Sequence, residues 1–149
     1  MRAVVQRVSS SKVTVDGVVT GNINNGLNVL LGVEKGDQKK DAEYIADKVS
    51  GLRIFKDGED KMNLSVLDVA GSVLMISQFT LLGDARKGKR PSFSEAAEAD
   101  LANELYVYTC ELVREKGITV ETGVFQAHMD VEIRNDGPVT IILDSRRKF

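Results

Sequence analysis

A polar tetrapeptide, Ser77-Gln78-Phe79-Thr80, directly follows the apolar run VLMI at 73–76. Hydroxyl and carboxamide side chains, together with main-chain N–H groups exposed where a strand ends, can bind a carbonyl oxygen and stabilise an oxyanion. The same residues also suit a strand that runs into a turn, with Phe79 in the core and the serine and threonine as turn formers. The spacing alone leaves both interpretations open, and the turn is the simpler one.

A second motif, Asn135-Asp136-Gly137-Pro138-Val139-Thr140, lies between two strand-like runs. Asp-Gly-Pro in such a place is typical of a hairpin loop. Glycine also permits backbone angles that other residues resist, and it lets the main chain approach a ligand closely. Proline has no N–H and can follow a cis peptide bond, although trans is the usual form. Taken alone, the motif favours the hairpin.

Basic residues gather in two places and suit contacts with phosphate groups. They are Arg86, Lys87, Lys89 and Arg90 in the loop 83–91, and Arg146, Arg147 and Lys148 near the C-terminus. The formal net charge of −2 argues against a protein that binds nucleic acid by overall basicity. Any RNA contact therefore has to use local patches, and a solvated loop and tail is the plainer interpretation.

The composition excludes several classes of protein. With Cys110 as the single cysteine, no internal disulfide can form, and with one histidine the chain has too few soft ligands for a zinc site. We expect no metal and no cofactor. The N-terminus lacks the pattern of a signal peptide, and no stretch approaches the ~20 apolar residues of a membrane span. A cytoplasmic protein without membrane contact is the expectation.

Apolar and β-branched runs predict the strands. Asp16-Gly17 lies between two such runs and predicts a hairpin. Asn25-Gly26 leads into the most apolar run, which predicts a buried central strand. Asp57-Gly58 marks a further turn. The expected strands are residues 2–8, 27–33, 52–55, 73–76, 118–121, 124–134 and 138–143.

Two segments have helical periodicity. The first begins near Asp37, a good N-cap residue, and has an apolar stripe. The second follows Ser92 and Glu95, which have the spacing of a capping box, and ends at Gly117. The first stripe consists of Ala42, Ile45, Ala46 and Val49, and the second of Ala97, Leu101, Leu105, Tyr108 and Leu112.

The order of these elements predicts one α+β or mixed α/β domain over residues 1–149. Short connections favour a mainly antiparallel, barrel-like sheet of about seven strands that carries two helices. The helices cover one face of the sheet. A second copy of the chain is the simplest cover for the other face, so we expect a homodimer.

Taken together, the motifs resemble the D-aminoacyl-tRNA deacylase family. SQFTL at 77–81, RPSF at 90–93 and NDGPVT at 135–140 carry the resemblance. The opening MRAVVQRV and the stretch KMNLSV at 61–66 are also similar to that family. The resemblance covers essentially the whole chain in order, and the pairing of SQFTL with a late NDGPVT is its specific part.

The resemblance implies a homodimeric enzyme that hydrolyses the ester of D-aminoacyl-tRNA. Gly137 and Pro138 would form a cis-peptide clamp that enters the active site of the partner subunit, where main-chain carbonyls exclude an L side chain. Glycine is achiral and small, so some glycyl-tRNA activity is expected. Arg7 would tether the Gly-Pro loop, and Phe125 and Met129 would line the pocket, although both also suit the core of a strand.

The same resemblance assigns the chemistry to residues 77–80. Amides near Phe79 would hold the oxyanion, while the 2′-hydroxyl of the terminal adenosine assists the attack of water. Thr80 is the obvious alternative nucleophile, but a threonine hydroxyl needs a base. The one histidine, His128, lies in a strand-like stretch and is a poor candidate. Two other functions remain open at this point: a non-catalytic tRNA-binding module and a threonine-dependent esterase of small esters.

Overall fold

The computed structural model describes residues 1–149 and contains two α-helices, one 3-10 helix and eight strands. The strands are β1 (Arg2–Val15), β2 (Val18–Ile23), β3 (Gly26–Gly32), β4 (Phe55–Lys56), β5 (Met62–Leu64), β6 (Ser72–Ser77), β7 (Thr119–Thr122) and β8 (Asp130–Asp144). The helices are α1 (Lys39–Gly51), the 3-10 helix η1 (Phe79–Leu82) and α2 (Ala99–Glu115).

The main sheet has six strands and is mixed. Its order is β2-β1-β3-β6-β7, and β8 pairs with β1. The long strand β1 pairs antiparallel with β2, β3 and β8, whereas β3–β6 and β6–β7 are parallel. β4 and β5 form a separate two-stranded sheet. The predicted α+β fold with a mainly antiparallel sheet and two helices is confirmed.

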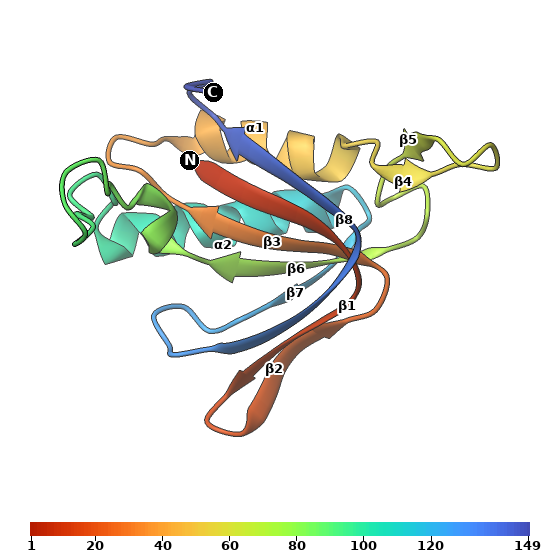
Figure 1. The fold of residues 1–149 in the computed structure, drawn as a ribbon, viewed down its shortest axis with the longest axis horizontal. Helices are drawn as coiled ribbons and strands as arrows, with labels where there is room; N and C mark the ends of the chain where they lie inside the picture. The colour runs from red at the N-terminus through yellow and green to blue at the C-terminus, as the bar shows by residue number, and fades with distance from the viewer.

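Both helices pack on one side of the sheet (Figure 1). The predicted stripe of α1 is confirmed, because Ala42, Ile45, Ala46 and Val49 are all buried in the main core. Alternate residues of β6 serve two cores: Val73 and Met75 face the helices, while Leu74 and Ile76 belong to a second cluster. That smaller cluster also holds Val8, Val13 and Ile23 of the curled strands β1 and β2, which makes the sheet barrel-like.

The Asn135–Thr140 motif is not a hairpin, and this prediction was wrong. β8 continues through it as one strand and pairs with β1 on both sides, Gln6 with Thr140 and Val8 with Asn135. Between these pairs one residue of β1 faces four of β8, so the extra residues form a bulge. Bulges bend strands, and β1 and β8 bend together in Figure 1.

The predicted start of α1 near Asp37 is confirmed: the N-cap is the next residue, Gln38, and Asp37 accepts a hydrogen bond from the Glu34 N–H at 2.6 Å. Two predicted strand boundaries were wrong. The strand expected at 52–55 shrinks to Phe55–Lys56. The strand expected at 124–134 starts only at Asp130, because residues 123–129 form a loop.

The second helix starts later than the capping-box pattern predicts, at Ala99 with Glu98 as N-cap. The segment before it is tied to neighbouring segments by main-chain hydrogen bonds: Ser92 pairs with Asp84, and the Ala97 N–H donates to the Val33 carbonyl. Tertiary pairing therefore overrides the local signal. Leu105 of the predicted stripe is fully buried, but the most buried face continues through Tyr106, Thr109, Cys110 and Val113. The predicted helix end is confirmed, with Gly117 at φ 89°.

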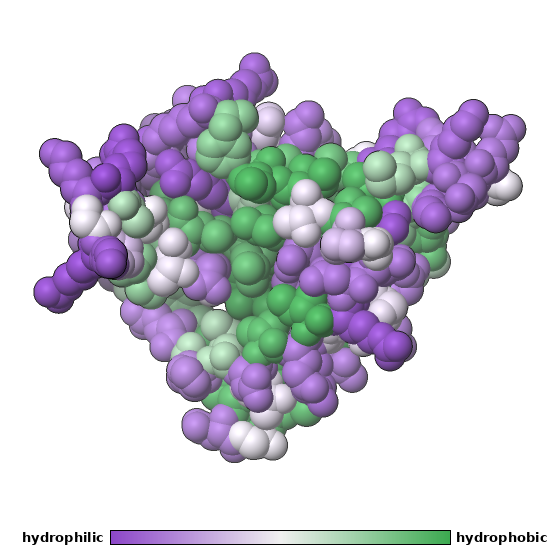
Figure 2. Space-filling model, viewed as in Figure 1, coloured by the Kyte–Doolittle hydropathy of each residue, from purple (hydrophilic) through white to green (hydrophobic).

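The face of the sheet away from the helices is only partly covered. Apolar side chains gather in the middle of the surface in Figure 2, which has the orientation of Figure 1. Ile142 of β8 is 60% exposed, and Ile133 of the same strand is half-buried against the smaller cluster. Neither α-helix is long and apolar enough to cross a membrane.

Candidate functional site

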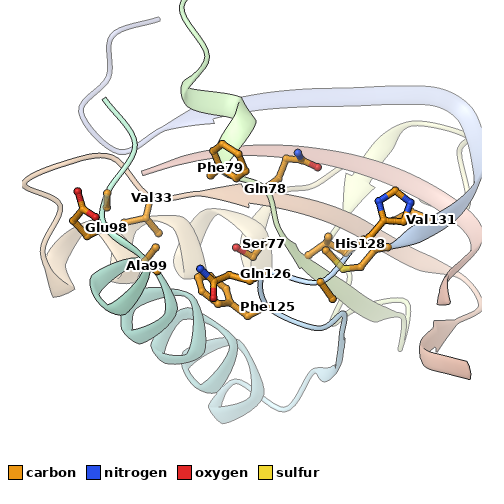
Figure 3. A pocket seen from close by; sticks show the side chains of 15 residues that line it. Val33, Ser77, Gln78, Phe79, Glu98, Ala99, Phe125, Gln126, His128 and Val131 are labelled. Carbon is orange, nitrogen blue, oxygen red and sulfur yellow. The ribbon is translucent and has the colours of Figure 1, made fainter. Parts of the chain in front are cut away.

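A pocket of about 570 Å³ opens where the end of β6 meets the start of α2 and the loop 123–129 (Figure 3). Ser77, Gln78 and Phe79 form one wall, and Ala99 and Ala102 of α2 form another. Ten of its 15 lining residues are hydrophobic. Such a cavity suits an organic ligand that is oriented by a few polar groups.

The end of β6 presents unused main-chain donors. The Gln78 N–H donates to Leu31 at 2.8 Å and closes the last rung of the parallel pairing with β3. No turn or loop hydrogen bond uses the N–H of Phe79 or Thr80, the first residues of η1. The first N–H groups of a helix have no partner within it. Adjacent donors at the wall of an apolar pocket are suited to binding a carbonyl or an oxyanion.

Thr80 differs from its three neighbours in the tetrapeptide. It is exposed and is not among the residues that line the pocket. Its hydroxyl oxygen accepts a hydrogen bond from the Gln78 carboxamide. The structure therefore brings Ser77, Gln78 and Phe79 to the cavity and leaves the Thr80 side chain outside it.

The loop 123–129 contributes both predicted pocket residues, Phe125 and Met129, and also two residues that the sequence did not place at the pocket. His128 is exposed and lines the pocket, although we expected it inside a strand. Gln126 lines the pocket as well, with φ 65°. No local pattern marks these two, since they reach the site only because the loop packs against β6.

Gly137 and Pro138 are exposed, and neither lines the pocket of its own chain. The peptide bond between them is cis. Behind them, Arg7 is only 5% exposed. Its guanidinium donates to the Asp136 carbonyl at 3.1 Å and to the Ile54 carbonyl at 2.7 Å, and it lies 3.3 Å from the Asp136 carboxylate. Arg7 thus connects the bulge of β8 to the segment that leads into β4.

The loop 83–91 follows η1 and carries its four basic residues on the surface. The Arg86 guanidinium binds Asp84 with N–O distances of 2.9 and 2.6 Å, and these hydrogen bonds hold the pKa of the Asp84 carboxyl well below its usual value. Lys87, Lys89 and Arg90 take part in no ion pair of the protein. The free positive charge of this loop therefore comes from these three residues.

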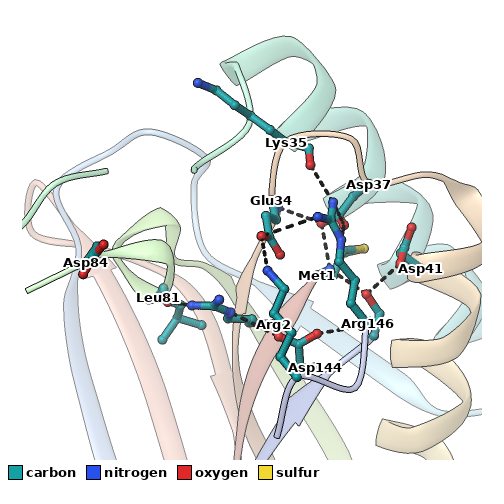
Figure 4. Close-up of polar contacts among 12 residues, drawn as sticks. Met1, Arg2, Glu34, Lys35, Asp37, Asp41, Leu81, Asp84, Asp144 and Arg146 are labelled. Atoms are coloured by element: carbon teal, nitrogen blue, oxygen red, sulfur yellow. Dashed lines mark hydrogen bonds and ion pairs between the residues drawn. The ribbon is translucent and has the colours of Figure 1, made fainter. Parts of the chain in front are cut away.

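Two of the C-terminal basic residues, Arg146 and Lys148, are engaged by carboxylates elsewhere, so they do not extend that patch as the sequence suggested (Figure 4), and Arg147 lies over the Tyr44 ring. Arg146 lies 2.9 Å from the Asp37 carboxylate and 3.4 Å from Glu34, and Lys148 lies 2.5 Å from Glu34. The Met1 amino group is 2.7 Å from the other oxygen of Asp37. Buried carboxylates thus neutralise these cations.

Asp41 belongs to the same cluster. Burial by itself raises the pKa of its carboxyl, but hydrogen bonds from the Gln38 N–H and the Ser145 hydroxyl, with the positive charges of the amino terminus and Arg146, outweigh burial and lower that pKa. The Gln38 N–H lies 2.8 Å from Asp41 and completes the capping box of α1.

We expect Asp41→Asn to lower the free energy of unfolding at pH 7 by about 1 kcal/mol, the typical net contribution of one hydrogen bond. Because folding lowers the pKa of Asp41, its contribution is complete above the unfolded value of about 3.9 and is lost as the pH falls through the folded value. Urea unfolding of both proteins at pH 7 and in acid measures this difference. A difference that stays constant into acid would contradict the prediction.

Comparisons with a family model and with individual proteins agree on one family. The family described as D-Tyr-tRNA(Tyr) deacylase matches residues 4–144. A D-aminoacyl-tRNA deacylase of Anaeromyxobacter dehalogenans is 62% identical, and one of Thermotoga petrophila is 60% identical, each over the full length of both chains.

Two solved structures share the fold. One, a c-Myc DNA Unwinding Element Binding Protein, is 39% identical, has a TM-score of 0.90, and is matched over 97% of this chain and 98% of that one. The other, from a structural analysis of a probable eukaryotic D-amino acid tRNA deacylase, has a TM-score of 0.79 over 95% and 97% of the two chains. At 17% identity, the second shows likeness of fold alone.

Proposed function

The chain belongs to the D-Tyr-tRNA(Tyr) deacylase family and is a D-aminoacyl-tRNA deacylase, and on that premise we propose how its residues select and hydrolyse the ester. The pocket beside Ser77, Gln78 and Phe79 receives the aminoacyl end of the tRNA. The unused N–H groups of Phe79 and Thr80 carry this proposal, because they can stabilise the oxyanion that forms when water attacks the ester carbonyl.

The 2′-hydroxyl of the terminal adenosine assists the attacking water, and the protein positions the ester. The placement of Thr80 supports this assignment. Its side chain lies outside the pocket, and its hydroxyl is held by Gln78 rather than by a basic group. A threonine nucleophile needs a general base within hydrogen-bonding reach.

Selection against L-amino acids falls to Gly137 and Pro138 of a second subunit. Both residues are exposed and lie outside the pocket of their own chain, so in a monomer they cannot contact a substrate bound there. In a homodimer the bulge of one subunit reaches the pocket of the other, and the partly covered apolar face of β8 supplies contact area. Glycyl-tRNA, which has no side chain to exclude, is a second substrate.

Arg7 tethers this gate, because its guanidinium holds Asp136 next to Gly137. Lys87, Lys89 and Arg90 contact the tRNA backbone near the pocket. We place the activity in the cytoplasm, where charged tRNA is used.

The direct test compares D- and L-tyrosyl-tRNA, each in large excess over the protein, and follows release of the amino acid. Many turnovers with the D substrate and little hydrolysis of the L substrate are expected. Comparable rates for the two enantiomers would refute the gate. A small D-tyrosyl ester without tRNA serves as a further substrate, and its rapid hydrolysis would favour a simple esterase.

Thr80→Ala is expected to leave the single-turnover rate constant within about fivefold of the wild-type value, whereas removing a true nucleophile costs on the order of 10⁴-fold or more. The expectation follows from the place of the Thr80 side chain outside the pocket. Single-turnover hydrolysis of D-tyrosyl-tRNA measures the effect, with Thr80→Ser as the matched variant that keeps the hydroxyl. Complete loss in the alanine variant, with the fold and tRNA binding intact, would make Thr80 a catalytic group.

A further inference from the structure

Gln126 has a backbone conformation that favours glycine. The Ala127 N–H donates to the Val124 carbonyl at 3.2 Å and closes a turn, in which Gln126 is the third residue with φ 65°. That position of a turn is usually filled by glycine or asparagine, since a side chain there crowds the main chain. The chain has five non-glycine residues with positive φ, and among them Gln126 is the one that lines the pocket.

The Gln126 side chain is exposed and lines the cavity (Figure 3). Its carboxamide offers one acceptor and two donor hydrogens. The sequence thus retains a long polar side chain at a strained position, and that side chain faces the place where the substrate binds.

The neighbouring residue, Phe125, provides a fixed aromatic surface. Its ring packs on Tyr106 with 6.2 Å between the centroids. Tyr106 is buried, and its hydroxyl donates to the Met75 carbonyl at 2.7 Å. Phe125 is therefore held from behind by a residue anchored in the main core, and consecutive residues of one turn present an aromatic ring and a carboxamide.

We propose that Gln126 is a substrate-binding residue that recognises the base of the 3′-terminal adenosine, an inference that rests on the proposed function. A carboxamide can donate to N7 of adenine and accept from its N6 amino group at the same time. Unpaired bases in protein–RNA complexes commonly stack on aromatic rings while their edges are hydrogen-bonded. Holding the base in this way orients the attached ribose, and with it the 2′-hydroxyl and the ester.

The test combines a variant with a modified substrate. For wild-type protein, a terminal 7-deazaadenosine in D-tyrosyl-tRNA removes the N7 acceptor and leaves the carboxamide N–H unpaired, so KM is expected to rise on the order of tenfold. Gln126→Gly is expected to raise KM for the unmodified substrate by a similar factor. The 7-deaza change should then have little further effect on this variant, because the contact is already absent.

Stability provides the control against a merely structural role. Gln126→Gly relieves the strain of a positive φ in the backbone, so Tm should stay the same or rise by up to about 4 °C. Ala70→Gly makes the same change at an exposed position with φ 51° away from the pocket, and its KM should equal that of the wild type.

Two other results would contradict the inference about Gln126. If Gln126→Gly has an unchanged KM, Gln126 is not a binding residue. If its KM rises but the 7-deaza effect persists undiminished, the contact is not with adenine. The proposed function fails separately, since in that case the wild-type protein itself would not release D-tyrosine from unmodified tRNA.

Discussion

Hydrolysis of D-tyrosyl-tRNA is expected to slow by roughly 100-fold or more when the 2′-hydroxyl of the terminal adenosine is replaced by hydrogen, the size of effect that an acid–base group contributes. The reason is the lining of the pocket, which offers main-chain donors beside Phe79 but places the Thr80 hydroxyl outside. Under single-turnover conditions, the loss should fall on the rate of hydrolysis, while the dissociation constant of the tRNA changes little.

His128 supplies the sharpest control for this experiment. It lines the pocket, and an imidazole is the most frequent general base in enzymes. We expect His128→Asn to keep most of the activity, since in the proposed mechanism the RNA assists the attack of water. Undiminished hydrolysis of the 2′-deoxy substrate, together with loss of activity in His128→Asn, would transfer the role of base to the histidine.

The second large effect is expected for Gly137→Ala, which should lower kcat/KM for D-tyrosyl-tRNA by roughly 100-fold, as displacement of a substrate-positioning group by about 1 Å can do. Gly137 has φ 129°, where an L residue is strained. An added Cβ would lie 2.9 Å from Val139 Cγ2, 3.0 Å from Val139 N and 3.2 Å from Arg7 Nη2. The added methyl group therefore pushes directly on the proposed gate and on its proposed tether, Arg7.

Gly58→Ala is the matched control. Gly58 is exposed in the turn between β4 and β5, and an added Cβ would meet no atom within 4 Å. Its activity and its preference for D over L substrate should equal those of the wild type. If the proposed gate is right, Gly137→Ala should also hydrolyse L-tyrosyl-tRNA relatively better than the wild type does, because a displaced gate would exclude the L side chain less well.

Co-expression of two inactive variants tests whether the gate acts between subunits. Ala99→Trp blocks the pocket from the exposed start of α2, and Gly137→Ala spoils the gate. If the subunits pair at random, half of the dimers are mixed and each has one intact composite site, so about a quarter of wild-type activity should return. A gate that acts within its own chain predicts no recovery.

The two helices show which structural features a local sequence pattern can predict and which it cannot. The stripe of Ala42, Ile45, Ala46 and Val49 is a property of neighbouring turns, and it is buried as predicted. The predicted start of α2 was wrong because the local capping signal at Ser92 competes with main-chain hydrogen bonds to Asp84 and Val33. Those partners are separated from the segment by eight or more residues, so no local rule includes them.

The tetrapeptide and the Gly-Pro motif show the same difference between what the local sequence can predict and what tertiary pairing decides. The sequence identified Ser77, Gln78 and Phe79 as a group at the end of a strand, and the structure places all three at the pocket. It could not show that Gly137 lies in a bulge of one continuous strand, because a bulge is defined by the register of the partner strand.

By itself, the sequence determined the types of the main elements, the turns at Asp16-Gly17 and Gly117, and the family to which the motifs belong. Only the tertiary structure decided which side chains share the pocket. His128 and Gln126 line the pocket because a loop that follows β6 by more than 40 residues packs against the end of that strand. Arg146 and Lys148 form ion pairs with carboxylates more than 100 residues away, so they do not join the basic loop. Propensity and periodicity act over a few residues, whereas packing and charge pairing join residues at any separation.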